Sequence, residues 1–247
     1  YTAEMLKFII NTAKFESIKL PDKSDPLGIA IDNTQGKIWI AEGIGKIASL
    51  DISDNRITEF TPTGNYTMKG PTGIILDSQT GKVYISEHEG YAVTVFDPLL
   101  KTFEKIQLDP NKDNLPYGMA FDKYHNLWVA QHTLDKISII DPRTREVTEK
   151  NIPSSNTWIQ WLTSDSQGNI IMAEERANAL AIATISAGQL QNNQDSQDNI
   201  SAVIPNLGFD YAQVMAPTIS GLLVVVAFFY CKSIVDLRKA SSQVRKL

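Results

Sequence analysis

The chain repeats itself with a period near 45 residues. Residues 26–42 read PLGIAIDNTQGKIWIAE, residues 71–87 read PTGIILDSQTGKVYISE, and residues 116–131 read PYGMAFDKYHNLWVAQ. Each unit holds four short apolar runs, which are separated by turn residues such as Gly, Pro, Asn and Asp. Helical repeats of this length would need longer runs with a 3.6-residue period, and these units have none. Four strands at this period are typical of a β-propeller blade.

The repeat assigns residues 1–185 to one domain. Three units are whole, and a fourth, from Trp158 to about Ile185, supplies three more strands. Before the first whole unit, YTAE resembles the end of a second strand, and LKFIIN and KFESIKLP match a third and a fourth strand. The sequence therefore predicts an all-β fold, a β-propeller of four-stranded blades with about 4.5 blades present, which begins in the middle of a blade.

The C-terminal quarter of the chain has a different character. Residues 186–213 are rich in Gln, Asn, Asp and Ser and hold too little apolar surface to fold alone, so we expect a polar stalk. Residues 214–231, VMAPTISGLLVVVAFFYC, carry no charge, and as a helix they would extend roughly 27 Å, about one hydrocarbon core. The alternative, a buried core helix, is disfavoured by the terminal position and the basic flank. We predict a C-terminal transmembrane α-helix at 214–231, followed by a basic tail at 232–247.

Charge divides the chain in the same way. Residues 1–213 carry 18 Lys or Arg and 27 Asp or Glu, whereas the rest of the chain carries five cations and one acid. Cations beside a span favour the cytoplasmic side. We therefore expect a single-pass protein of the cell membrane, with the propeller extracytoplasmic and the C-terminus cytoplasmic. Translocation of the propeller needs a signal, so we expect the native N-terminus to lie upstream. An acidic body argues against nucleic acid as a partner.

The repeated phrase resembles the repeat of the virginiamycin B lyase (streptogramin lyase) family over residues 1 to about 185. This resemblance implies a seven-bladed propeller, and hence further blades upstream. It also implies an elimination that opens the ester ring of streptogramin antibiotics, with Mg²⁺ bound near a general-base His. The residues that carry the resemblance, together with their counterparts one and two units on, are Pro26, Gly28, Asp32, Gly36, Trp39 and Glu42.

The family's base is expected in the middle of a Pro-His-Gly motif. Here the middle positions hold Leu27, Thr72 and Tyr117, and the final unit reads Ile-Gln-Trp with Gln160 in the middle. Leu cannot accept a proton, and neutral Thr or Tyr is a poor base near pH 7. The catalytic pair of the family is therefore missing from these blades, and a lyase would need its base in blades outside them.

An acid closes the second strand of most units. We interpret this series as structural, with each carboxylate accepting hydrogen bonds at a strand end. The alternative is a cation site at the mouth of a central channel. The series is Glu4, Glu42, Glu87 and Glu174, with Gln131 in the remaining unit.

Two histidines directly follow this series. His88 and His132 occupy equivalent places on adjacent blades, so they are expected within about 10 to 15 Å of each other. With Glu87, Glu89 or Asp135 they could hold a divalent metal. The candidate metal site is therefore His88, His132 and Glu87, and no other cofactor is expected.

The other repeated side chains have structural interpretations. Trp39, Tyr84 and Trp128 share one position, which predicts packing between blades. His125 replaces a turn residue, which predicts a surface position. The aspartates that precede the turns are predicted to cap them, and they are Asp32, Asp77, Asp122 and Asp165.

Asn65 and Asn199 begin Asn-x-Ser/Thr sequons, which fit glycosylation of an outward-facing body. Our leading functional hypothesis is a non-catalytic propeller that acts as a binding or assembly module, an accessory subunit of a larger membrane complex. The alternatives are a Mg²⁺-dependent C–O lyase with its His in N-terminal blades not present here, and a periplasmic metal-binding protein.

Overall fold

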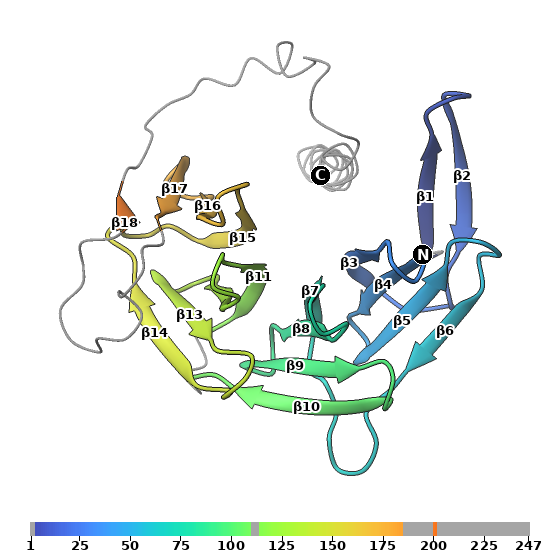
Figure 1. Cartoon of the computed structure of the whole chain (residues 1–247), viewed down its shortest axis with the longest axis horizontal. Helices are drawn as coiled ribbons and strands as arrows, with labels where there is room; N and C mark the ends of the chain where they lie inside the picture. Colours follow the sequence, from blue (N-terminus) through green and yellow to red (C-terminus); the bar gives the residue numbers. More distant parts are fainter. Residues whose placement is uncertain (1–2, 110–113, 185–199, 202–247) are drawn as a thin grey trace, which may run out of the picture. The chain divides into compact units, whose positions relative to one another are not determined.

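A computed structural model describes residues 3–109, 114–184 and 200–201. It contains four four-stranded antiparallel sheets and one two-stranded hairpin (Figure 1). The strands are β1 (Glu4–Ile9), β2 (Lys14–Lys19), β3 (Pro26–Asp32), β4 (Lys37–Glu42), β5 (Lys46–Asp51), β6 (Ile57–Phe60), β7 (Pro71–Leu76), β8 (Val83–Glu87), β9 (Ala92–Asp97), β10 (Thr102–Gln107), β11 (Pro116–Phe121), β12 (Leu127–Gln131), β13 (Lys136–Ile140), β14 (Val147–Asn151), β15 (Ile159–Ser164), β16 (Ile170–Glu174), β17 (Ala179–Ala183) and β18 (Ile200–Ser201).

Each sheet is a meander whose strands pair in sequence order. We name the sheets blade 1 (β3–β6), blade 2 (β7–β10), blade 3 (β11–β14) and blade 4 (β15–β18). The first strands of successive blades contact one another, and Figure 1 shows the fourth strands β6, β10 and β14 on the outside. This is the arrangement of a β-propeller, so the predicted all-β fold class is confirmed.

The hydrophobic core is divided into layers between successive sheets. One layer joins blades 1 and 2 around Trp39 and Phe96, the next joins blades 2 and 3 around Tyr84 and Leu127, and a third surrounds Trp128 between blades 3 and 4. Trp39, Tyr84 and Trp128 are at most 4% exposed. Their predicted role in packing between blades is confirmed.

The two ends of the described propeller differ in part from what the sequence predicted. The hairpin β1–β2 packs Met5 and Leu20 against blade 1, as expected for the second half of a blade. Glu4, however, begins the first strand of this hairpin, where its carboxylate accepts a hydrogen bond from the Ser17 hydroxyl at 2.8 Å. It therefore does not continue the series at the ends of second strands. In blade 4 the outer strand β18 comes from residues 200–201, within the range predicted to be a stalk.

The described residues include no helix that is long and apolar enough to cross a bilayer. The predicted span at 214–231 and the predicted tail at 232–247 lie outside the described residues.

Candidate functional site at the Pro-x-Gly end of the blades

The repeated Pro-x-Gly phrase and the acid series meet at one end of the sheets. Pro26 pairs with Glu42, Pro71 with Glu87 and, in blade 3, Pro116 with Gln131. Directly after each Pro the register slips, so the middle residue of the motif lies in an irregularity of the inner strand. Irregularities of this kind re-aim a side chain out of the ladder. We call this end of the sheets the Pro-x-Gly end.

Five rings gather at this end, which we call the aromatic cluster. The ring centroid of His88 lies 5.5 Å from that of Tyr117 and 6.0 Å from that of His132. Tyr117 lies 5.4 Å from His132 and 5.1 Å from Trp161, which it meets edge to face. His132 meets Trp158 edge to face at 5.3 Å. Since Trp161 is 39% exposed, the cluster presents aromatic surface to solvent. The two histidines were predicted from their place in the repeat, whereas neither tryptophan was predicted as part of a site.

Trp158 is held in a strained conformation. Its φ of 50° lies in the left-handed region, which is unusual for a bulky side chain. The Asp135 carboxylate fixes the preceding loop, because it accepts the N–H of Asn156 at 2.8 Å and the N–H and hydroxyl of Thr157 at 2.9 Å. The Arg176 guanidinium then lies 3.7 Å from the Trp158 ring centroid, a cation–π contact. Strain of this kind persists only where the surroundings enforce it, and it clusters at functional sites.

The electrostatics keep the two histidines neutral and Asp135 charged. Burial lowers the pKa of His88 and of His132, and His132 lowers that of His88 further. Burial by itself would raise the pKa of Asp135, but the hydrogen bonds from Thr157 and Asn156 outweigh it and hold this pKa below its usual value. Within the part of the chain that the structure describes, the buried Nε2 of His88 and both ring nitrogens of His132 have no hydrogen-bond partner. At neutral pH each imidazole therefore offers a lone pair.

Glu87 is bonded to groups other than the two histidines. Its buried carboxylate accepts the backbone N–H of Lys69 at 2.8 Å and is bonded to the hydroxyls of Tyr66 and Thr94. This agrees with the structural interpretation of the series, since a backbone donor satisfies the acid at a strand end. Within the described residues, no group of three or more His, Cys, Asp or Glu is placed to hold a metal. The metal site predicted at His88, His132 and Glu87 stays a prediction; the structure brings the two histidines together without Glu87.

The other members of the series are all buried but differ in their partners. The Gln131 amide is bonded to the Ser138 hydroxyl. Neither carboxylate oxygen of Glu42 has a hydrogen-bond partner among the described residues. Burial, followed by the charge of Glu59, raises the pKa of Glu42 to about 7. Burial also raises the pKa of Glu174. The three glutamates at this position, Glu42, Glu87 and Glu174, therefore differ in hydrogen bonding.

The middle residues of the motif differ from blade to blade. Leu27 is 48% exposed, whereas Thr72 is buried and its hydroxyl donates to the Gly70 carbonyl. Tyr117 belongs to the aromatic cluster, and Gln160, which directly precedes Trp161, is half-buried. None of these four side chains is a proton acceptor suited to neutral pH.

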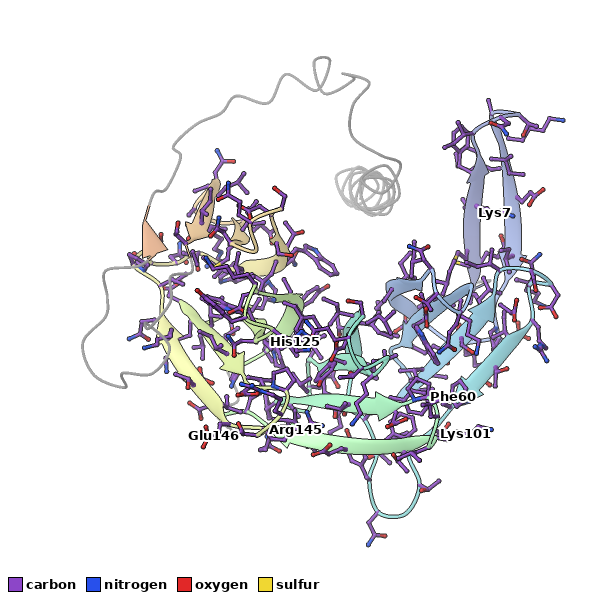
Figure 2. The ribbon with its side chains drawn as sticks, viewed as in Figure 1. Lys7, Phe60, Lys101, His125, Arg145 and Glu146 are labelled. Atoms are coloured by element: carbon purple, nitrogen blue, oxygen red, sulfur yellow. The ribbon has the colours of Figure 1, made fainter. Side chains whose placement is uncertain are left out.

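At the opposite end of the blades, the predicted caps are confirmed. Each aspartate accepts hydrogen bonds from backbone N–H groups of the turn that follows it, in Asp32, Asp77, Asp122 and Asp165. His125 is less exposed than expected (Figure 2). Its ring stacks on Phe121, its side chain is 20% exposed, and its Nε2 lies 3.1 Å from Asp77 Oδ2 in the neighbouring blade. It is therefore a contact between blades.

Of the two sequons, Asn65 is exposed in the loop between β6 and β7. Asn199 lies outside the described residues. Glycosylation at either position stays a prediction.

A scan against protein-family models and a search of curated proteins found no match. Solved structures do match. A virginiamycin B lyase from Staphylococcus aureus has a TM-score of 0.65 and 22% identity, over 74% of this chain and 60% of that chain. A catalytically inactive form of the S. aureus lyase, solved with quinupristin, has a TM-score of 0.65 and 21% identity, over 73% of this chain and 59% of that one. Hydrazine synthase from Kuenenia stuttgartiensis has a TM-score of 0.56 and 15% identity, over 68% of this chain and 47% of that one.

The chain thus spans about 60% of the length of the lyase structure. At these identities the likeness concerns the fold, and at that level the predicted resemblance to virginiamycin B lyases is confirmed. This chain has the β-propeller fold of the virginiamycin B lyases.

Proposed function

We propose that this chain is a binding and assembly module whose recognition surface is the aromatic cluster at the Pro-x-Gly end. The observation that carries the proposal is the strained Trp158, clamped by Asp135 beside the exposed Trp161. Loops held on a rigid scaffold are where binding usually resides, and Trp, Tyr and Arg are the side chains that dominate binding energies. Trp158, Trp161, Tyr117 and Arg176 supply that set on neighbouring blades.

The Pro-x-Gly positions of this surface carry no base suited to neutral pH. A catalytically inactive form of the S. aureus lyase, which shares this fold, was solved with quinupristin. In this chain the Pro-x-Gly position at the centre of the cluster holds Tyr117, whose phenol is a poor base near pH 7. Binding therefore accounts for the cluster better than elimination does.

We place the module outside the cytoplasm, on a single membrane span at 214–231, as an accessory subunit of a membrane complex. The uncharged run, the basic residues after it and the acidic body before it support this arrangement. The partners are then other membrane subunits, which the cluster would contact.

Truncation of Trp161 tests the recognition surface. We expect Trp161→Ala to weaken partner binding by about 30-fold or more, because loss of an aromatic anchor costs about 2 kcal/mol. The measurement is recovery of defined membrane partners with the full-length protein purified in mild detergent. Tyr124→Ala is the matched control, since Tyr124 is 44% exposed at the opposite end of blade 3. Recovery that is the same for both variants would exclude the cluster as the surface, and a lone wild-type monomer would exclude the subunit role.

The histidine pair favours a second candidate function, the binding of a divalent metal. Two neutral imidazoles with ring centroids 6.0 Å apart could share one ion, with water as its remaining ligands. The family resemblance implies Mg²⁺, but Mg²⁺ prefers oxygen ligands, and the Glu87 carboxylate is engaged with Tyr66 and Thr94. Imidazole suits Zn²⁺, Ni²⁺ or Cu²⁺ better.

Calorimetric titration with Zn²⁺ tests this candidate. We expect binding to the wild type at micromolar ion concentrations, with loss of at least tenfold in affinity in His88→Ala/His132→Ala. His125→Ala is the control, because His125 lies at the other end of blade 3 and is expected to leave the titration unchanged. Unchanged binding in the double variant would eliminate the pair as a metal site.

A further inference from the structure

Neighbouring blades leave a groove between the outer part of one sheet and the hairpin turn of the next. The repeat aligns the residues that line two such grooves. Between blades 2 and 3 they are Tyr84 on β8, Glu104 on β10 and Arg145 in the turn before β14. Between blades 1 and 2 the aligned residues are Trp39 on β4, Thr58 on β6 and Lys101 in the turn before β10. The two grooves can therefore be compared position by position.

The groove between blades 2 and 3 is filled by Arg145. Its guanidinium donates to both carboxylate oxygens of Glu104, at 2.9 and 3.2 Å, and to the Tyr84 hydroxyl at 3.3 Å. Figure 2 shows Arg145 beside β10, and its side chain is 23% exposed. The guanidinium therefore joins the Glu104 carboxylate and the Tyr84 phenol across this groove.

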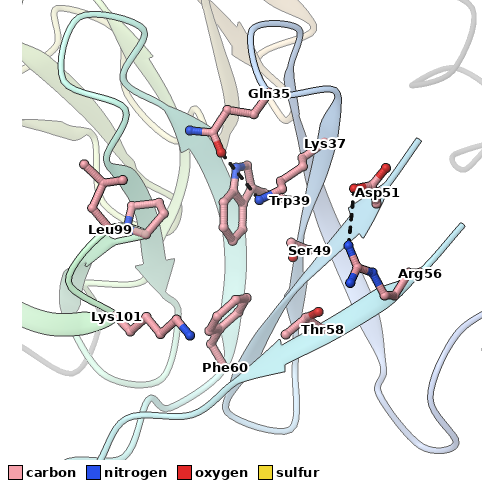
Figure 3. Close-up of a pocket in the computed structure, with 11 residues that line it drawn as sticks. Gln35, Lys37, Trp39, Ser49, Asp51, Arg56, Thr58, Phe60, Leu99 and Lys101 are labelled. Atoms are coloured by element: carbon pink, nitrogen blue, oxygen red, sulfur yellow. Dashed lines mark hydrogen bonds and ion pairs between the residues drawn. The ribbon is translucent and has the colours of Figure 1, made fainter. Parts of the chain in front are cut away.

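The groove between blades 1 and 2 has no equivalent of the Glu104–Arg145 ion pair. Lys101 is shorter than Arg, and Thr58 stands where the carboxylate of Glu104 would be. In the described part of the chain, no ion pair is found for Lys101. A pocket of about 310 Å³ remains (Figure 3), lined on its apolar side by Trp39, Phe60 and Leu99. Figure 3 shows the Lys101 side chain extending toward Phe60.

The indole N–H of Trp39 is a buried donor at this pocket. Trp39 is 1% exposed, and among the described residues its Nε1 finds no hydrogen-bond partner. At the same position in blade 3, the Trp128 Nε1 donates to Asp122 Oδ2 at 2.9 Å. Blades 1 and 3 therefore differ in how the side chain at this position is bonded, and the Trp39 N–H can report on a ligand that binds beside the ring.

We propose that the pocket between blades 1 and 2 binds a small aromatic carboxylate. The carboxylate takes the place of the missing acid and accepts hydrogen bonds from the Lys101 ammonium, while Lys37, which donates to Gln35 Oε1 at 3.4 Å, adds positive charge at the rim. The ring lies on Phe60, with Leu99 over its edge and Trp39 in the wall of the pocket. A volume near 310 Å³ is at the small end of ligand sites and suits a body of one or two rings. This site is separate from the aromatic cluster, because Lys37 and Leu99 lie toward the opposite end of the sheets.

The experiment titrates 2-naphthoate into the full chain labelled with ¹⁵N-tryptophan. We expect a saturable shift of the Trp39 indole N–H signal in the wild type and an affinity about tenfold or more lower in Lys101→Ala. The neutral analogue 2-naphthamide is expected to bind much more weakly than 2-naphthoate. Lys14→Ala, an exposed lysine on β2, is the matched control and is expected to bind as the wild type does.

A double variant that introduces the ion pair into the open groove gives the most direct test. Thr58→Glu/Lys101→Arg copies the Glu104–Arg145 pair into the open groove, and both sites are exposed, so the variant is expected to fold and to unfold at an equal or higher temperature. It should give no Trp39 shift with 2-naphthoate. An unchanged shift in this variant, equal binding of the amide, or no saturable shift in the wild type would each overturn the proposal.

Discussion

Gly73→Ala is expected to destabilise the propeller by about 3 kcal/mol or more. Gly73 is the glycine of the second Pro-x-Gly motif. A Cβ placed on it would lie 2.3 Å from the Tyr117 carbonyl oxygen in the next blade and 2.8 Å from the Ser86 hydroxyl oxygen. Neither can give way, because the Ser86 hydroxyl donates to that same carbonyl at 2.6 Å and accepts the Gly73 N–H at 2.8 Å. The substitution must therefore separate two inner strands.

Gly64→Ala is the matched control for this clash. Gly64 has a φ of 76° in the loop before β7, and a Cβ there meets nothing within 4 Å. Only the left-handed backbone then opposes alanine, which costs about 1 kcal/mol. Urea unfolding of the two variants measures the difference. Equal losses of stability would show that backbone strain, rather than the approach of neighbouring blades, explains the glycine of the motif.

The fold was predictable because the repeat is a physical constraint as well as a pattern. The same close approach recurs at Gly28, where a Cβ would lie 2.3 Å from the Thr72 carbonyl oxygen, and at Gly118, where it would lie 2.5 Å from that of Gln160. Blades 1, 2 and 3 therefore need a glycine at this step, where the inner strand approaches that of the next blade. The turn-capping aspartates were predictable for a similar reason, because each unit has the same turn after its first strand. The aromatic residues between blades were predictable because Trp39, Tyr84 and Trp128 fill equivalent places in blades 1, 2 and 3.

The candidate site was less predictable, because it depends on which loops meet across blades. His88 and His132 were found by their shared place in the repeat. Trp158 and Trp161 lie in the unit that departs most from the pattern, and the signal that could have found them is that departure. The placement of Glu4 in the acid series was wrong, because it rested on a single matching residue. In the structure Glu4 begins the first strand of a hairpin.

The pocket between blades 1 and 2 could not be predicted from its residues taken one at a time. Lys101, Thr58 and Trp39 are unremarkable in the sequence one at a time. Their meaning comes from the comparison with Arg145, Glu104 and Tyr84, which requires the register of two hairpins. A repeat protein therefore reveals candidate sites where one copy of a shared contact is missing.

Glu42→Gln is expected to remove a pH dependence from the stability of the propeller. The carboxyl of Glu42 is fully buried, and burial, followed by the charge of Glu59, raises its pKa from 4.5 to about 7, against the attraction of Lys46. Between these two pH values the folded chain holds a proton that the unfolded chain has released. Stability therefore falls as the pH rises from about 4.5 to about 7, by up to about 1.4 kcal/mol per pH unit, and stays reduced above that range.

The glutamine variant keeps the shape of the neutral acid and cannot ionise. It should match the wild type near pH 4.5 and exceed it by about 2 to 3 kcal/mol above pH 7, as measured by urea unfolding across that range. Gln131, at the same position in blade 3, shows that an amide fits at this strand end, because it is bonded to Ser138. Gln131→Glu is the reciprocal variant, and it should create a second falling slope, since it buries a carboxyl near Glu149, which is itself bonded to Ser138 at 2.6 Å. A slope that survives in Glu42→Gln would mean that another buried group holds the proton, and Glu174, whose pKa burial also raises, would be the next residue to test.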